Sequence, residues 1–115
     1  MKSCYEMSKA KTNIVENIDS IRSSVTAANY EPIPTAIQNI KGSIKSLFCE
    51  EIVGIKKLLN ALIIELNKYK NKGEKYKPVG NVVAQITKIL VAMGQEAFNT
   101  SCKHSEGFQE NKIKF

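Results

Sequence analysis

The stretch IKSLFCEEI, residues 44–52, decides how many helices the chain forms. Apolar residues on both sides follow helical spacing, but the join through Ile44, Phe48 and Ile52 takes two consecutive steps of four, so the apolar stripe changes phase near Cys49. Either one helix of about 36 residues runs from 35 to 70, or the chain breaks here and two acidic residues begin a new helix, where the helix dipole favours negative charge. Helices in globular proteins average about 11–12 residues, so we predict the break.

On either side of this stretch the apolar spacing is helical, and the alternation typical of strands is absent. The first apolar stripe runs from Met7 to Ala28. The segment EPIP, residues 31–34, must end that helix, because proline disfavours the α region at the residue before it. Gly73 and Pro78 mark a later turn. We predict an all-α fold, a small antiparallel four-helix bundle with disulfide cross-linking, with helices at about 3–28, 35–48, 51–71 and 79–101.

The length and composition are those of one compact soluble domain. The chain has 115 residues, of which 43% are apolar and 24% charged, which is enough apolar material for a single core. We assign residues 1–102 to the helical bundle domain and 103–115 to a polar C-terminal tail. The longest uninterrupted apolar stretch, Ile89 to Met93, is far shorter than the roughly 20 residues of a membrane span, so we expect no transmembrane segment.

Three cysteines, Cys4, Cys49 and Cys102, are too far apart in sequence for a zinc or redox motif. With four antiparallel helices all three lie at one end of the bundle, whereas three helices would place Cys4 and Cys102 at opposite ends. Disulfide partners need Cα atoms within about 7 Å, so if a bridge exists the four-helix fold is favoured. We predict a bridge between Cys49 and Cys102, with Cys4 the less certain partner, and a stabilisation of about 4 kcal/mol.

The cysteines also bear on whether the protein is secreted or cytosolic. No signal peptide precedes the first helix, and we expect Lys2-Ser3-Cys4 to be the start of a mature secreted chain, with Met1 added for expression. Because the number of cysteines is odd, one cysteine either keeps a free thiol or forms an intermolecular disulfide. We expect a monomer, and a dimer through the odd cysteine is the alternative. Three unpaired thiols in a cytosolic helical protein is the competing interpretation. The glycosylation sequon at Asn99 is expected once by chance and adds little.

The charge is +6, and sixteen of the seventeen basic residues are lysines. Phosphate and base recognition favour the guanidinium group of arginine, so we do not expect nucleic acid as a partner. The densest cationic segment is KYKNKGEKYK, residues 68–77, around one predicted turn. Lysine accelerates encounter with acidic partners and tyrosine adds rigid contact area, so the segment is a candidate protein contact; a solvated turn is the alternative. The predicted partner-binding residues are Lys68, Tyr69, Lys70, Lys72, Lys75, Tyr76 and Lys77.

Catalytic groups are scarce. The single histidine, His104, lies beside Cys102, but a catalytic dyad would need an orienting third group and a cleft. Glu50 and Glu51 are interpreted as the start of a helix. No glycine-rich phosphate loop and no cluster with metal-ligand spacing occurs. We therefore predict a binding protein that is not an enzyme and has no cofactor and no metal.

Four features of the sequence suggest a family: the helical segment KAKTNIVENI (9–18), the breaker EPIP (31–34), the junction FCEEI (48–52) and the late Cys102. With them the whole chain resembles the anopheline mosquito salivary family that includes anophensin and albicin. The resemblance implies a secreted saliva protein that suppresses host defence. Its partner would be a plasma protein, either the alternative-pathway complement convertase or factor XII and kininogen of the contact system. A cationic membrane-active or lipid-binding bundle, suggested by the lysines and leucines from Ile52 to Lys77, is the alternative.

Overall fold

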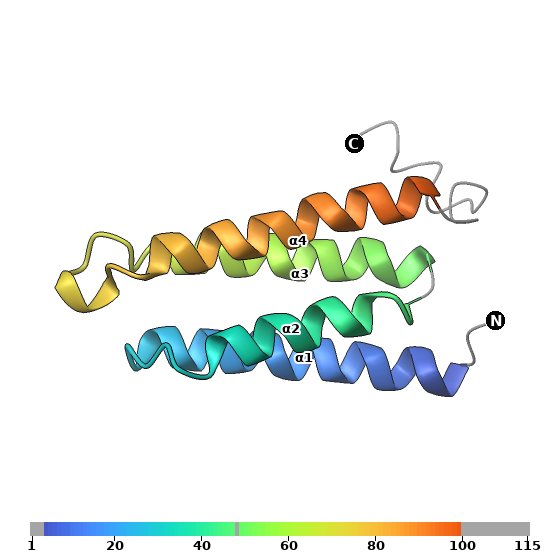
Figure 1. Ribbon diagram of the computed structural model, residues 1–115, viewed down its shortest axis with the longest axis horizontal. Coiled ribbons are helices and arrows are strands. Elements are labelled where there is room, and N and C mark those ends of the chain that lie inside the picture. Colours follow the sequence, from blue (N-terminus) through green and yellow to red (C-terminus); the bar gives the residue numbers. More distant parts are fainter. Residues whose placement is uncertain (1–3, 48, 100–115) are drawn as a thin grey trace.

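The computed structural model describes residues 4–47 and 49–99 and contains four α-helices in that part of the chain (Figure 1). They are α1 (Cys4–Thr26), α2 (Ile33–Ile44), α3 (Cys49–Asn67) and α4 (Val79–Asn99), with a short 3₁₀ helix, η1 (Glu74–Tyr76), before α4. The described residues include no strand. The predicted all-α fold is therefore confirmed, and so is the break that separates α2 from α3.

The helix bounds differ from the prediction by up to four residues: α2 ends at Ile44 and not at 48, and α3 spans Cys49–Asn67 and not 51–71. The start of α2 and the end of α1 differ as well, each for a local reason. Helix α2 begins at Ile33, before the predicted start, because Pro34 lies in the first turn, where a helix does not need its N–H group. Helix α1 ends at Thr26 because Ala28 adopts a left-handed conformation with φ of 54°. The N–H of Ala28 donates to the carbonyl of Val25 at 2.9 Å, and that of Asn29 donates to Ser24 at 2.9 Å. This pair of bonds is a Schellman motif, which caps the helix end.

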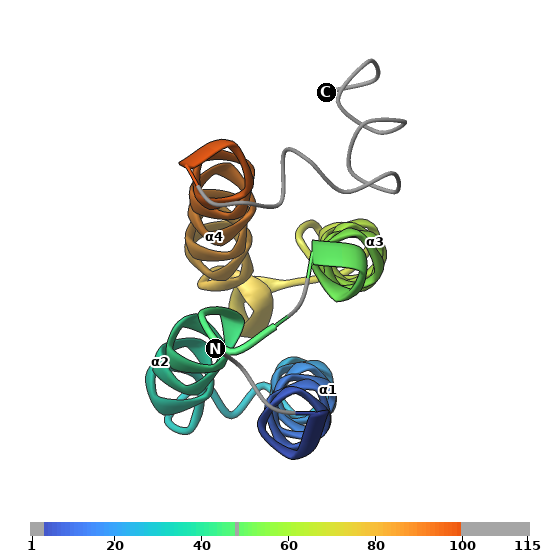
Figure 2. The same cartoon turned by 90° about the vertical axis from the view of Figure 1, so that its right-hand side faces the viewer.

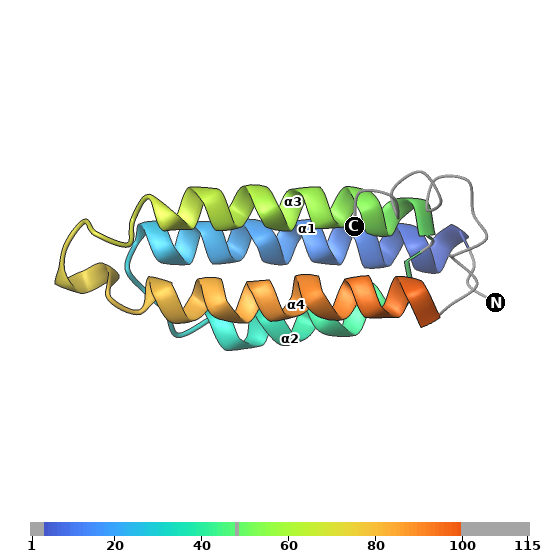
Figure 3. The same ribbon diagram turned by 90° about the horizontal axis from the view of Figure 1, so that it is seen from above.

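The four helices form two antiparallel hairpins that lie on one another as two layers. Figure 2, which looks along the helices, shows the α1–α2 pair as one layer and the α3–α4 pair as the other. From above, α3 lies over α1 and α4 lies over α2 (Figure 3). Neighbouring helices within a layer are antiparallel, as predicted, whereas neighbours in different layers run in the same direction. Packing is closest within the hairpins, weaker between α1 and α3, and weaker again between α2 and α4.

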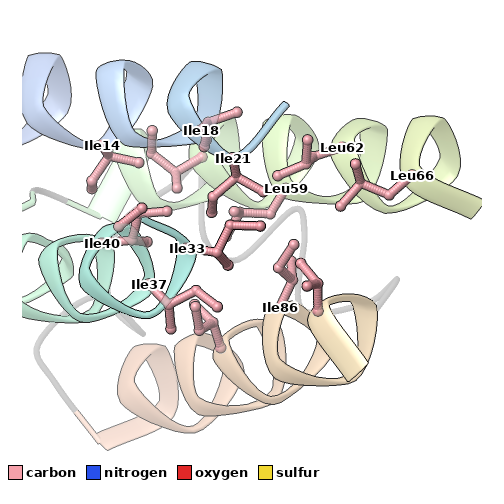
Figure 4. Packing of buried hydrophobic residues seen from close by; sticks show 14 of the residues in the cluster. Ile14, Ile18, Ile21, Ile33, Ile37, Ile40, Leu59, Leu62, Leu66 and Ile86 are labelled. Carbon is pink, nitrogen blue, oxygen red and sulfur yellow. The ribbon is translucent and has the colours of Figure 1, made fainter. Parts of the chain in front are cut away.

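The core lies between the two layers and consists mainly of isoleucine and leucine. In Figure 4 the predicted stripe of α1 faces the stripe of α3, and α2 and α4 close the cluster from the opposite side. Each stripe repeats every three or four residues, so it stays on one side of its helix. The side chains labelled in the cluster are buried: Ile14, Ile18, Ile21, Ile33, Ile37, Ile40, Leu59, Leu62, Leu66 and Ile86.

Two ion pairs connect the layers along the seam between α1 and α3. Nζ of Lys11 lies 2.9 Å from Oε2 of Glu51, and Nε of Arg22 lies 2.8 Å from Oε1 of Glu65. The hydrogen bond to Glu65 is the main cause of a raised pKa at Arg22. Because both pairs are partly solvated, each contributes at most about 1 kcal/mol, and they fix the relative position of the layers more than they stabilise the fold.

The end of the bundle predicted to carry the cysteines contains the starts of α1 and α3 and the end of α4 (Figure 1). The side chains of Cys4 and Cys49 lie outside the described residues, as does the whole of Cys102. The Cys49–Cys102 bridge therefore stays a prediction. The tail 103–115 also lies outside the described part of the chain, so the boundary at residue 102 stays a prediction too.

Replacing Ala28 by Gly is expected to raise the free energy of unfolding by up to about 1 kcal/mol, because glycine adopts the left-handed conformation without the steric cost borne by alanine. Urea unfolding followed by circular dichroism would measure the change. The same substitution at Ala27, which does not have a positive φ, is the matched control and is expected to destabilise the protein. Equal effects of the two substitutions would contradict the role assigned to Ala28.

Candidate functional site

The predicted contact segment, residues 68–77, connects α3 to α4 and is called here the lysine-rich tip. It lies at the end of the bundle opposite the start of α1 (Figure 1). The chain turns at Gly73, whose φ of 136° is a conformation that residues with a side chain rarely adopt. Five lysines project from this short segment beside a single glutamate, Glu74. All five are exposed: Lys68, Lys70, Lys72, Lys75 and Lys77.

The two tyrosines of the tip lie in different surroundings from those predicted. Tyr76 is only 9% exposed and belongs to the hydrophobic core, and Tyr69 is half-buried against it. Their ring centroids are 5.2 Å apart with the ring planes tilted by 49°, a favourable arrangement for an aromatic pair. Tyr76, predicted as a partner-binding residue, is thus buried in the free protein, because η1 turns its ring into the bundle.

Hydrogen bonds join the lysine-rich tip to the turn between α1 and α2. The hydroxyl of Tyr30 donates to the carbonyl of Lys75 at 2.6 Å. The hydroxyl of Tyr76 donates to the carbonyl of Thr26 at 3.4 Å, and the hydroxyls of Thr26 and Tyr69 are 3.4 Å apart. Partial burial, with a smaller contribution from Tyr76, raises the pKa of Tyr30. The tip is thus held by the opposite hairpin before any partner binds.

Two of the exposed lysines of the tip lie over tyrosine rings. Nζ of Lys72 is 5.3 Å from the ring centroid of Tyr69, and Nζ of Lys75 is 5.3 Å from that of Tyr76. Contacts of this kind contribute about 0.5–1 kcal/mol at exposed sites. They restrict where the two ammonium groups lie while leaving them accessible, so the tip presents a fixed cationic surface.

An exposed isoleucine beside the tip is a candidate contact residue that the sequence did not indicate. Ile64 on α3 is 64% exposed, the largest fraction for any large apolar side chain in the described part of the chain. It lines a pocket of about 460 Å³ whose other members are Ala61, Glu65, Lys68, Tyr69 and Lys72. The signal available in the sequence was that Ile64 lies off the core stripe through Leu59, Leu62 and Leu66.

The other candidate groups fall partly outside the described residues. Cys102 and His104 lie outside them, so the structure gives no geometry for that pair. Glu51 lies near the start of α3, where it pairs with Lys11. Within the described part of the chain, no three histidine, cysteine, aspartate or glutamate side chains are placed to hold a metal ion. None of the described helices combines the length and apolar character that a membrane span requires.

No protein-family model, curated protein or solved structure matches the chain. The features available for a functional proposal are thus the fixed cationic tip, the exposed Ile64 beside it and the family resemblance of the sequence.

Proposed function

We propose that this chain is a secreted salivary inhibitor of host defence, and that it acts by binding a plasma protein through the lysine-rich tip and Ile64. The observation that carries the proposal is an exposed apolar side chain on α3, Ile64, beside the lysines of a turn that hydrogen bonds already hold in place. Binding sites of proteins commonly combine an apolar anchor with a polar rim.

The charges and the anchor have separate roles in this proposal. Exposed lysines accelerate encounter with an acidic surface, whereas a buried anchor determines how long the complex lasts. Complete burial of an isoleucine contributes about 1.5–3 kcal/mol relative to full exposure, and Ile64 begins 64% exposed. Because the tip is already ordered, little conformational entropy is lost on binding.

The identity of the partner is proposed from the resemblance to the salivary family. The two candidates are the alternative-pathway complement convertase and factor XII with kininogen. In either case inhibition occurs by occlusion of the partner's surface, with no bond made or broken. The inhibitor is therefore consumed in proportion to its partner, and the degree of inhibition depends on the ratio of the two proteins.

The experiment is a titration of the full chain into two assays, alternative-pathway lysis of erythrocytes in serum and contact activation in plasma. We expect saturable inhibition of one assay, reached at a fixed ratio of inhibitor to target and unchanged by longer preincubation. Inhibition that grows with preincubation at substoichiometric amounts would indicate catalysis and refute the proposal. Absence of inhibition in both assays would refute the proposed targets.

A membrane-active bundle is the second candidate, and one observation favours it. Leu58 and Ile64 are both exposed on α3, on the same helix as the exposed Lys57. Vesicles that contain anionic lipid and an entrapped dye separate the two functions. We expect no dye release at concentrations that inhibit the plasma assay. Dye release with loss of the bundle's thermal transition would favour the membrane function instead.

A further inference from the structure

A second groove lies between α2 and α4, away from the lysine-rich tip. Its volume is about 510 Å³, within the range of about 300–1,000 Å³ typical of small-ligand sites. The floor consists of Ile44, Ile89 and Met93, which are part of the hydrophobic core. The groove lies between α2 and α4, which pack less closely than the other pairs of adjacent helices. Met93 is unbranched and can change rotamer to admit an apolar chain.

The rim of this groove is cationic. Lys41 lies in the last turn of α2, Lys45 directly follows that helix, and Lys88 lies on α4 across from them. All three are exposed, and none forms an ion pair with another residue in the described part of the chain. Among the described residues that line the groove none is acidic. Within the described part of the chain the site therefore offers positive charge directly above an apolar floor.

We propose that this groove binds a long-chain fatty acid, whose carboxylate lies among the lysines and whose acyl chain lies along the floor. A small anion such as phosphate would leave the apolar floor uncovered, and an uncharged lipid would leave the lysines without a partner. A long-chain carboxylate satisfies both parts, because lysine forms charge-assisted hydrogen bonds with carboxylates and each buried methylene group adds to the affinity. This site is independent of the proposed plasma-protein contact.

Gly42 leaves room for such a ligand. It lies on the wall of the groove, and a Cβ atom added at this position would meet no atom within 4 Å. A larger side chain here can occupy the groove without a clash, and leucine has a higher helix propensity than glycine. Gly42→Leu is therefore a variant that should obstruct the groove while keeping the fold.

The test uses the full chain and cis-parinaric acid, a fluorescent fatty acid, below its micelle concentration, with oleate and methyl oleate as competitors. We expect saturable binding of one probe per chain, displaced by oleate and at least tenfold less well by methyl oleate. The variants are Lys41→Gln/Lys45→Gln/Lys88→Gln and Gly42→Leu, and each should weaken probe binding about tenfold or more. Circular dichroism and thermal unfolding establish that each variant is folded.

The matched control is Lys70→Gln/Lys72→Gln/Lys75→Gln, which removes the same number of charges from the lysine-rich tip. This control should bind the probe as the unaltered chain does. Equal weakening by the groove and tip variants would show that probe binding follows net charge and would overturn the proposal. Wild-type probe affinity in both groove variants, or no saturable binding by the full chain, would overturn it as well. The plasma assays described above are read separately, so the two proposals can fail independently.

Discussion

Replacing Tyr76 by Ala is expected to lower the free energy of unfolding by about 3 kcal/mol, because the substitution removes a buried aromatic ring from the core. The ring packs against Tyr69, and its hydroxyl donates to the carbonyl of Thr26. Its loss leaves a cavity at the point where the lysine-rich tip joins the other hairpin. Chemical denaturation followed by circular dichroism would measure the effect.

Two controls separate packing from surface contact. Tyr76→Phe keeps the ring and loses one long hydrogen bond, so it should cost about 0.5–1.5 kcal/mol. Ile64→Ser removes a side chain that is mostly in solvent and should change stability by no more than about 0.5 kcal/mol. If Tyr76→Ala left stability unchanged and weakened only partner binding, the ring would be a surface anchor and the placement described here would be wrong.

Replacing Lys70, Lys72 and Lys75 by Gln is expected to lower the association rate with the plasma partner about tenfold and to change the dissociation rate little. The three ammonium groups are exposed, so they act mainly on the encounter of the two proteins. Salt should likewise slow association of the unaltered chain more than it speeds release, because ions screen charges beyond about 8–10 Å. Surface plasmon resonance at several ionic strengths would separate the two rates.

Ile64→Ser supplies the complementary measurement, because loss of an anchor acts on dissociation. We expect about a tenfold to thirtyfold faster release with an association rate close to that of the unaltered chain. The groove variant Lys41→Gln/Lys45→Gln/Lys88→Gln is the charge-matched control and should keep both rates, apart from a small loss of long-range attraction. An unchanged association rate in the tip variant would mean that the tip is a solvated turn only.

The helices could be predicted from sequence because each places an apolar residue every three or four positions. The phase change near Cys49 located the break between α2 and α3. The exact ends depended on backbone geometry that apolar spacing does not encode. Ala28 continues the apolar stripe of α1 in sequence, yet it adopts a left-handed conformation beyond the last turn of the helix.

The exposed lysines of the tip could also be predicted, since a run of charges around Gly73 and Pro78 rarely lies in a core. The burial of Tyr76 could not, because it depends on Thr26 and Tyr30, which lie some fifty residues earlier in the chain and meet the tip only when the hairpins pack. The exposure of Ile64 depends in the same way on which side of α3 the second layer covers.

The most direct test of the proposed function compares three proteins in the plasma assay that the unaltered chain inhibits: the unaltered chain, the tip variant at Lys70, Lys72 and Lys75, and the groove variant at Lys41, Lys45 and Lys88. Each variant lacks three lysines, so their net charges are equal. We predict that the tip variant needs about tenfold more protein for half-maximal inhibition, whereas the groove variant inhibits as the unaltered chain does. Equal inhibition by all three proteins would contradict the claim that the lysine-rich tip is the binding site.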